Sequence, residues 1–301
     1  MSDRSGWRHD RRRYQSATGR GLVRSYPVSD GVDQHRFVFV GGLPRSGTTL
    51  LAAEIARSPG VSNLEGIGVV ADEGQYVQSV YTTQRDAGGI GRFAYSPDMH
   101  LTEHSPHADR SSRDSLWRDW APYWDTSKEV LVEKTPSNLL KMRFLQAVFP
   151  GSAFVVVVRH PVAEAMAIRS RGWSGRPASK LIDHWVTAHA IMTGDLPAVD
   201  RVVVVRYEDL VAHPAEVLRG LQDFLEIAPV PTGDEPRQGL NDRYFDEWAS
   251  HGWRARVDNR RVVRRFESAI GAFGYSFASP NPVGPLAADL PTLDLPDTPS
   301  A

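Results

Sequence analysis

The sequence predicts an α/β fold of three layers, with helices on both faces of a central parallel sheet. Four short apolar runs have the length and composition of fully buried strands: FVFV at 37–40, VLVE at 130–133, FVVVV at 154–158 and VVVV at 202–205. Helical patterns follow or separate these runs, and this alternation is typical of parallel sheets covered on both faces. A glycine-rich turn follows the first run, and we expect this turn to be a phosphate-binding loop after the first strand.

This turn has the spacing of a phosphate-binding loop but lacks its lysine. Residues 42–49 read GLPRSGTT, whereas the loop of nucleoside triphosphatases reads GxxxxGK[ST]. Thr48 stands where the lysine would be, and a cation lies within the loop instead, at Arg45. Glycines let backbone N–H groups turn toward an anion, and the following helix adds the positive end of its dipole. The loop therefore predicts a phosphorylated nucleotide as ligand, without handling of a γ-phosphate.

Two later segments have the periodicity of amphipathic helices. Pro214 opens one, whose apolar residues recur every three or four positions as far as Leu225, and the other ends before Gly274. The pattern breaks down between about 66 and 128. Within that stretch, LWRDWAPYW at 116–124 carries three tryptophans, which we expect to pack on the sheet rather than to stack on a ligand.

The composition is that of a soluble globular protein, with 41% hydrophobic and 24% charged residues in 301. A formal net charge of -1 gives no reason to expect nucleic acid as a partner. The absence of cysteine excludes disulfides, thiolate metal sites and a cysteine nucleophile. No run is apolar enough to span a bilayer or to form a signal peptide, so we expect a cytoplasmic protein. The frequent use of alanine, valine and arginine suggests a bacterial source.

The two ends of the chain are expected to be disordered. Residues 1–34 form a basic arm with few apolar residues, and residues 279–301 are rich in proline. This leaves one domain over residues 35–278.

Basic residues follow the predicted strands, at the edge where parallel sheets bind ligands. Lys134 follows the second run and Arg159 follows the third, so that together with Arg45 they could hold a polyanion without a metal ion. A triphosphatase would instead need an acidic residue at a strand end to bind Mg²⁺. Glu133 could serve as that residue, which keeps a kinase using ATP and Mg²⁺ as an alternative.

Four motifs together resemble a known family. PRSGTT at 44–49, EKTP at 133–136, VVRHP at 157–161 and RYEDL at 206–210 are similar in order and spacing to the sulfotransferases that use 3′-phosphoadenosine-5′-phosphosulfate. The similarity covers about 37–277 and is greatest to the branch that includes tyrosylprotein sulfotransferases and many bacterial relatives. The resemblance implies that a sulfuryl group is transferred to a hydroxyl or amine and that no metal ion takes part.

The resemblance also implies how the nucleotide is held. The 5′-phosphosulfate would lie on the loop residues Arg45, Ser46, Gly47, Thr48 and Thr49. Arg159 and Arg171 would bind the 3′-phosphate, and Tyr207 would contact the nucleotide. The family's serine eight positions after the first arginine is Ala167 here, so Ser170 or Arg171 would have to compensate. No residue of 241–257, where the family closes a loop over the nucleotide, can be assigned.

For the chemistry, the resemblance points to a general base and two cations. Glu65 lies twenty residues beyond Arg45, in a setting similar to that of the catalytic glutamate of the tyrosylprotein branch. Arg45 and Lys134 would stabilise charge on the sulfuryl oxygens and on the departing phosphate. Because small-molecule sulfotransferases use a histidine base, three histidines are rivals: His100, His104 and His107. Their polar surroundings favour a solvated loop over a metal site.

The sequence therefore predicts a sulfotransferase with 3′-phosphoadenosine-5′-phosphosulfate as co-substrate and no metal. The alternatives are a small-molecule kinase with a phosphate-binding loop and a nucleotide-binding module without activity. Small-molecule, glycan and peptide acceptors are all compatible with the sequence, which does not specify an oligomeric state.

Overall fold

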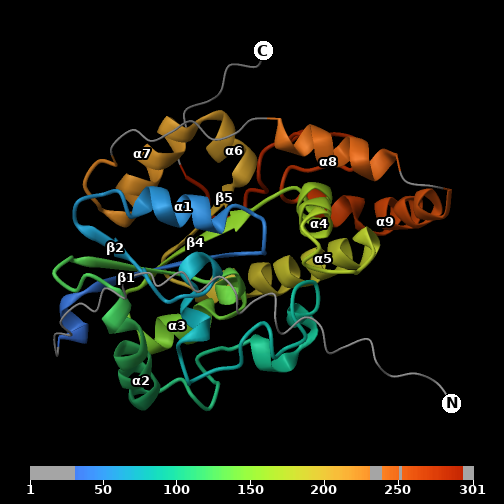
Figure 1. Ribbon diagram of the computed structural model, residues 1–301. Coiled ribbons are helices and arrows are strands. Elements are labelled where there is room, and N and C mark those ends of the chain that lie inside the picture. Colours follow the sequence, from blue (N-terminus) through green and yellow to red (C-terminus); the bar gives the residue numbers. More distant parts are fainter. Residues whose placement is uncertain (1–30, 231–238, 251–252, 294–301) are drawn as a thin grey trace, which may run out of the picture.

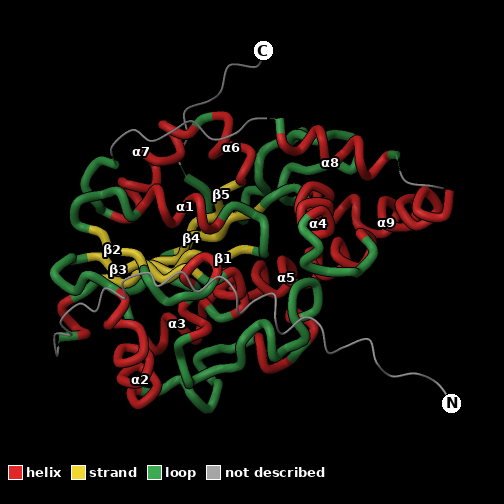
Figure 2. The backbone as a smooth tube through the Cα atoms, viewed as in Figure 1, coloured by secondary structure: helices red, strands yellow, loops and turns green. Residues whose placement is uncertain are grey.

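A five-stranded sheet forms the centre of the computed structural model, which describes residues 31–230, 239–250 and 253–293. The strands lie in the order β2-β3-β1-β4-β5, and every neighbouring pair is parallel (Figures 1 and 2). Their bounds are Arg36–Gly42 (β1), Val61–Asn63 (β2), Val130–Lys134 (β3), Ala153–Val158 (β4) and Val202–Arg206 (β5). The four predicted strands are confirmed, and β2 is an addition that the sequence did not reveal.

Side chains of each central strand alternate between two separate cores. Val38 and Val40 of β1 pack with α1 (Thr48–Ile55) and α7 (Pro214–Leu225) on one face. Phe37 and Phe39 pack on the other face, in a core that includes α2 (Arg110–Trp120), α3 (Met142–Val148) and α5 (Ala178–Asp195). Figure 1 shows the two helical layers above and below the sheet. This confirms the three-layer α/β/α architecture. Successive side chains of each buried strand point alternately to the two faces of the sheet.

The remaining helices bring later parts of the chain to the end of the sheet where the strands finish. Helix α4 (Pro161–Ser170) begins soon after β4, and α8 (Leu240–Ala249) packs against it. Helix α9 (Trp253–Gly271) packs against α5, while α6 (Tyr207–Ala212) directly follows β5. Short 3-10 segments, η1 to η8, lie at Val32–Gln34, Val70–Asp72, Gly74–Tyr76, Phe93–Tyr95, Pro97–Met99, Ala121–Tyr123, Pro136–Leu140 and Leu196–Ala198. No described helix is both long and apolar enough to cross a membrane.

The long segment between β2 and β3 is held to the sheet by tryptophans. Trp120 and Trp124 are fully buried. The indole N–H of Trp124 donates to the carbonyl oxygen of Val132 at 2.8 Å, and that of Trp120 donates to Gly74 at 3.0 Å. This confirms the expected packing role, since both rings fill the core while their N–H groups are satisfied.

The segment after α9 covers the outer edge of the sheet. The N–H of Val204 in β5 donates to the carbonyl oxygen of Pro291 at 2.7 Å, and Arg206 Nη1 donates to Gly284 at 2.7 Å. Leu290 is buried. The expectation of a disordered tail therefore does not hold for residues 279–293, because backbone and side-chain contacts fix them along β5. Residues 294–301, and residues 1–30 of the basic arm, lie outside the described part of the chain.

Candidate active site

The carboxyl ends of all five strands meet at one edge of the sheet, because every pairing is parallel. Along this edge lie Glu65 after β2, Lys134 at the end of β3, the loop after β1, Arg159 after β4 and Tyr207 after β5. Neighbouring strands are about 4.8 Å apart, so the row could accommodate an extended ligand. The fold thus brings together residues that are spread over more than half of the sequence.

Two glycines give the loop its shape. Gly42 has φ 151° and Gly47 has φ 105°, both conformations that residues with a Cβ rarely adopt. A Cβ at position 47 would lie 2.5 Å from Cδ2 of Tyr207, so the ring of Tyr207 packs directly on the loop backbone. Helix α1 begins at Thr48, and its first backbone N–H groups therefore point toward the space beside the loop.

Two polar side-chain atoms of the loop have no hydrogen-bond partner in the described part of the chain. The Ser46 side chain is fully buried, and its Oγ has no hydrogen-bond partner among the described residues. The same holds for the buried Nε of Arg45, whose backbone is left-handed with φ 76°. Buried polar atoms are nearly always satisfied, and strained backbone gathers at functional sites. Both observations indicate that this loop is built to receive a polar ligand.

Arg159 is held rigidly beside the loop. Its Nη1 donates to the carbonyl oxygen of Arg45 at 3.0 Å, while Nε and Nη2 donate to Oδ1 of Asn241 at 3.2 and 2.9 Å. The guanidinium carbon lies 4.3 Å from the ring centre of Tyr207 and 5.6 Å from that of Tyr244. Since a guanidinium has five N–H donors, these three bonds leave two for an anion. The side chain is only 3% exposed, so its charge is poorly screened by water.

Positive charge is concentrated around the loop. Burial lowers the pKa of Arg45, and the nearby charges of Arg171 and Arg159 lower it further. Such mutual repulsion would be relieved by a bound anion. The Arg45 guanidinium lies 5.3 Å from the ring centre of Trp173, which is partly exposed.

The two candidates to replace the family's serine differ in their environment. Ala167, at the serine position, is fully buried in α4. The hydroxyl of Ser170 donates to the carbonyl oxygen of Ala167 at 3.2 Å, so its proton is already used. Arg171 is exposed at the end of α4 and is close enough to affect Arg45 electrostatically. Arg171 is therefore the better candidate.

Asn241 is a site residue that the sequence did not reveal. Its Nδ2 donates to Glu208 Oε1 at 2.7 Å, which turns Oδ1 toward Arg159. Glu208 is fixed in turn by the backbone N–H of His160 and the hydroxyl of Tyr275. A single asparagine in a helix of mixed composition gives no signal in the sequence, and its contact with Arg159 spans 82 positions.

Lys134 lies beneath the segment that follows β2. Its side chain is 2% exposed, and Nζ donates to the carbonyl oxygen of Ala71 at 2.8 Å and lies 3.5 Å from Oε1 of Glu73. Burial lowers the pKa of Lys134, while the carboxylates of Glu73 and Glu133 oppose this effect. Lys134 pairs in register with Val40, two residues before the glycine loop.

Glu133 is committed to contacts inside the protein. It is fully buried; Oε1 accepts from the Gly74 N–H at 3.0 Å and the Thr135 hydroxyl at 2.6 Å, and Oε2 accepts from Asn138 Nδ2 at 2.6 Å. Burial raises the pKa of this carboxyl. Glu133 therefore ties the β2–β3 segment to the sheet, and it is poorly placed to bind Mg²⁺ for a kinase. Within the described chain, no three acidic, histidine or cysteine side chains gather as a metal site.

The carboxylate of Glu65 faces solvent. The residue is exposed, and its backbone N–H donates to the carbonyl oxygen of Tyr123 at 3.0 Å. Among the described residues, its side chain makes no hydrogen bond or ion pair. The structure thus places Glu65 at the predicted edge without fixing its carboxylate.

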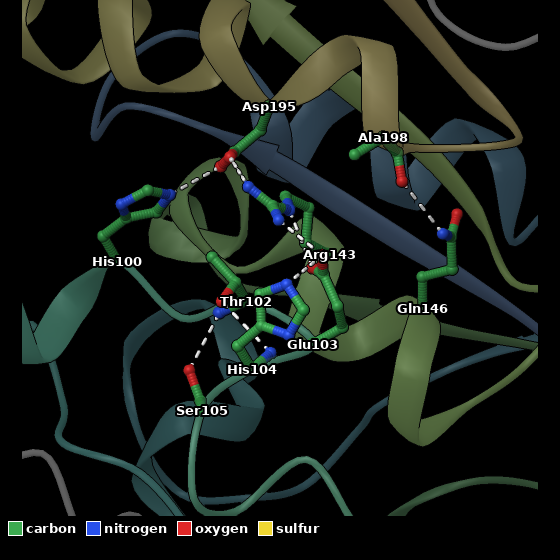
Figure 3. Close-up of polar contacts among 9 residues, drawn as sticks. All are labelled: His100, Thr102, Glu103, His104, Ser105, Arg143, Gln146, Asp195 and Ala198. Carbon is green, nitrogen blue, oxygen red and sulfur yellow. Dashed lines mark hydrogen bonds and ion pairs between the residues drawn. The ribbon is translucent and has the colours of Figure 1, made fainter.

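Two of the rival histidines, His100 and His104, lie in a cluster of charged side chains (Figure 3). His100 Nε2 lies 2.9 Å from Oδ2 of Asp195, and His104 lies 3.2 Å from Oε1 of Glu103. Asp195 ends α5, from which the chain runs to the amino-terminal end of β5, opposite the glycine loop. Arg143 joins Glu103 and Asp195 into one cluster of charges. His100 and His104 therefore serve this cluster, and the exposed His107 follows in the same loop.

Comparison with known proteins agrees with the motifs along this edge. The model of the sulfotransferase family matches residues 38–231, which include all five strand ends. The chain belongs to the sulfotransferase family. This confirms the resemblance inferred from the four sequence motifs. The family match ends before α8, so Asn241 and Tyr244 contact Arg159 from a part of the chain outside it.

The related sulfotransferases include proteins named for tyrosine acceptors. The chain is 27% identical over 198 residues to protein-tyrosine sulfotransferase 1 of Danio rerio, covering 63% of this chain and 53% of that protein. It is 25% identical over 206 residues to protein-tyrosine sulfotransferase A of Caenorhabditis elegans, covering 64% and 50%. The chain thus spans about half the length of these curated relatives. The sulfotransferase domain of the Synechococcus PCC 7002 olefin synthase aligns with 80% of this chain and 98% of its own, at 21% identity and a TM-score of 0.45.

Proposed function

We propose that this chain transfers the sulfuryl group of 3′-phosphoadenosine-5′-phosphosulfate to a hydroxyl or amine acceptor, without a metal ion. The observation that carries the proposal is the pair Arg45 and Arg159, which lie in contact at a glycine loop that lacks the triphosphatase lysine. The half-buried Arg45 and the buried Arg159 would replace the charge that Mg²⁺ and lysine supply to a triphosphate. The commitment of Glu133 to internal hydrogen bonds argues against the kinase alternative.

The nucleotide would lie across the edge with one phosphate on each side of the loop. The 5′-phosphosulfate would be bound by Arg45, Ser46, Gly47, Thr48 and Thr49, where the unpartnered Ser46 Oγ and Arg45 Nε support this assignment. The 3′-phosphate would be bound by Arg159 and Arg171. Tyr207, packed against Gly47 and Arg159, would contact the nucleotide between these two groups.

In the proposed reaction, the acceptor oxygen attacks sulfur in line with the bond to the bridging phosphate oxygen. That S–O bond breaks, and the 3′,5′-bisphosphate leaves. Arg45 and Lys134 stabilise the negative charge on the sulfuryl and leaving oxygens, which is worth most in a site with little water. A carboxylate takes the acceptor proton, and Glu65 is the candidate named by the sequence.

Tyrosine in a peptide is the first acceptor to test, because the relatives are named protein-tyrosine sulfotransferases. Small-molecule and glycan hydroxyls are further candidates. A cytoplasmic location and a bacterial source are predictions from composition alone.

The proposal is tested by binding and transfer with the purified chain. Calorimetry should show that 3′-phosphoadenosine-5′-phosphate binds more tightly than ATP with Mg²⁺. Transfer of ³⁵S from the labelled co-substrate to a tyrosine peptide should continue in the presence of EDTA. Tighter binding of ATP with Mg²⁺ would favour the kinase, whereas bisphosphate binding without transfer to peptide, phenol or sugar acceptors would indicate a module without activity.

Replacing Asn241 by alanine is expected to weaken bisphosphate binding about tenfold, because Arg159 loses the group that orients two of its N–H donors. The control is Asn259→Ala in α9, whose side chain donates to the carbonyl oxygen of Trp248 away from Arg159. Calorimetric dissociation constants for both variants check this. Equal affinities of Asn241→Ala and wild type would show that Arg159 needs no such support.

A further inference from the structure

Glu73 is the one carboxylate of the described chain within ion-pair distance of Lys134. We propose that Glu73 is the general base of the sulfuryl transfer, the role that the sequence suggested for Glu65. This inference rests on the proposed function and assigns one of its chemical roles.

The position of a base follows from that of the lysine. If Lys134 contacts the sulfuryl group, the attacking oxygen must pass within a few ångströms of its ammonium, since the oxygen bonds to the same sulfur. A base must lie within hydrogen-bond reach of that oxygen. Glu73 Oε1 is 3.5 Å from Lys134 Nζ, so an acceptor oxygen brought next to this ammonium would also lie close to this carboxylate.

The Glu73 carboxylate is oriented and has one oxygen available. Oε2 accepts a hydrogen bond from Gln75 Nε2 at 2.6 Å, while Oε1 is turned toward the ammonium at the longer distance. The side chain is 12% exposed. Burial raises the pKa of Glu73, and the charge of Lys134 opposes the rise, with Glu133 and Asp72 also facing that lysine. A carboxylate with a raised pKa is a stronger proton acceptor.

The backbone before Glu73 is held in an unfavourable conformation. Ala71 and Asp72 are consecutive left-handed residues, with φ 67° and 44°, and neither is glycine. Asp72 Oδ1 accepts from the N–H of Ile67 at 2.9 Å, which closes this turn. Each such residue costs about 1–3 kcal/mol and persists only where surrounding contacts fix it. This turn therefore places the Glu73 side chain next to Lys134.

The backbone after Glu73 is fixed to the sheet. The N–H of Gly74 donates to Glu133 Oε1, and its carbonyl oxygen accepts from the indole of Trp120. A Cβ at position 74 would lie 2.8 Å from Glu133 Oε1, so the segment fits closely there. Glu133 thus positions its neighbour Lys134 and Glu73 relative to each other. Glu65, by contrast, extends an exposed side chain that no described residue orients.

The proposed step needs no reactant other than the co-substrate, the acceptor and Glu73. Oε1 of Glu73 accepts the proton of the acceptor hydroxyl as the acceptor oxygen forms its bond to sulfur. The bond between sulfur and the bridging oxygen breaks, and its electron pair leaves with the bisphosphate. The products are the sulfated acceptor, the bisphosphate and a protonated Glu73, which loses its proton to solvent before the next turnover.

The test compares Glu73→Gln with wild type on two phenols, using ³⁵S transfer under single-turnover conditions. With phenol itself, which must lose a proton, the rate should fall about 10²–10³-fold. With 4-nitrophenol, ionised at the assay pH, the loss should be below about tenfold, because no base is needed. Glu73→Asp keeps a carboxylate and should recover part of the rate with phenol. The affinity for 3′-phosphoadenosine-5′-phosphate should stay within about twofold of wild type in both variants.

The matched control is Glu129→Gln, since Glu129 is an exposed partner of Arg36 at the amino-terminal end of β1. Equal losses with both phenols would make Glu73 a counter-ion of Lys134 and overturn the inference, as would an unchanged rate. A loss specific to phenol in Glu65→Gln, but not in Glu73→Gln, would return the role to Glu65. A wild-type chain that transfers no sulfuryl group to any acceptor would instead overturn the proposed function itself.

Discussion

Replacing Arg159 by alanine is expected to weaken binding of 3′-phosphoadenosine-5′-phosphate by about 10²–10³-fold. The buried guanidinium offers two N–H groups to an anion while its other three are held by Asn241 and Arg45. Its removal deletes charge-assisted bonds of a buried side chain and also frees the carbonyl oxygen of Arg45, which is expected to loosen the loop. Arg159→Lys should recover only part of the affinity, because an ammonium cannot form the planar fork.

Calorimetry on the folded variants measures this effect. Arg201→Ala is the control, since Arg201 pairs with Glu226 at the opposite, amino-terminal end of β5. If Arg159→Ala bound the bisphosphate with wild-type affinity, Arg159 would not be the residue that binds the 3′-phosphate. Equal losses in both arginine variants would show a general effect of net charge.

Replacing Gly42 by alanine is expected to destabilise the fold by about 3 kcal/mol or more. The new Cβ would lie 2.5 Å from the carbonyl oxygen of Val157 and 2.7 Å from Ser46 Oγ. Val157 is a backbone neighbour in the central strand β4, which cannot move aside without disturbing the sheet. The φ of 151° adds strain for any residue with a side chain.

Gly194→Ala is the control, and it is expected to change the free energy of unfolding in the opposite direction. Gly194 lies in α5, and a Cβ there would meet nothing within 4 Å, so alanine should stabilise by about 0.5–1 kcal/mol. Urea unfolding followed by tryptophan fluorescence gives both values. A loss below about 1 kcal/mol in Gly42→Ala would mean that the loop adapts to a side chain.

The buried strands and the glycine loop could be predicted because local composition determines them. The valine runs that became β3, β4 and β5 are largely buried on both faces, which favours apolar side chains along most of their length. Pro214 marked the start of α7 correctly, since its fixed φ and missing N–H suit a first turn. β2 escaped notice because it has three residues, of which only Val61 is a strong strand former.

The residues that hold the site residues in place could not be predicted, because their contacts join parts of the chain that are far apart in the sequence. Asn241 owes its role to Arg159 and Glu208, which lie on other elements. Glu73 lies in a stretch without periodicity, and its place depends on the hydrogen bond from Gly74 to Glu133. Glu133 itself was considered as a magnesium ligand from its position at a strand end. Its burial and its three donors gave it a structural role instead.

The hydrogen bond from Val204 to Pro291 gives the last described residues a protective role. β5 is one of the two edge strands of the sheet, and an edge strand with open N–H and carbonyl groups is a template for pairing with another molecule. The segment around Pro291 blocks this edge with a residue that has no N–H of its own to extend the sheet further. A chain cut after α9 would keep the whole region that matches the family and yet expose a valine-rich edge. Self-association would then compete with folding.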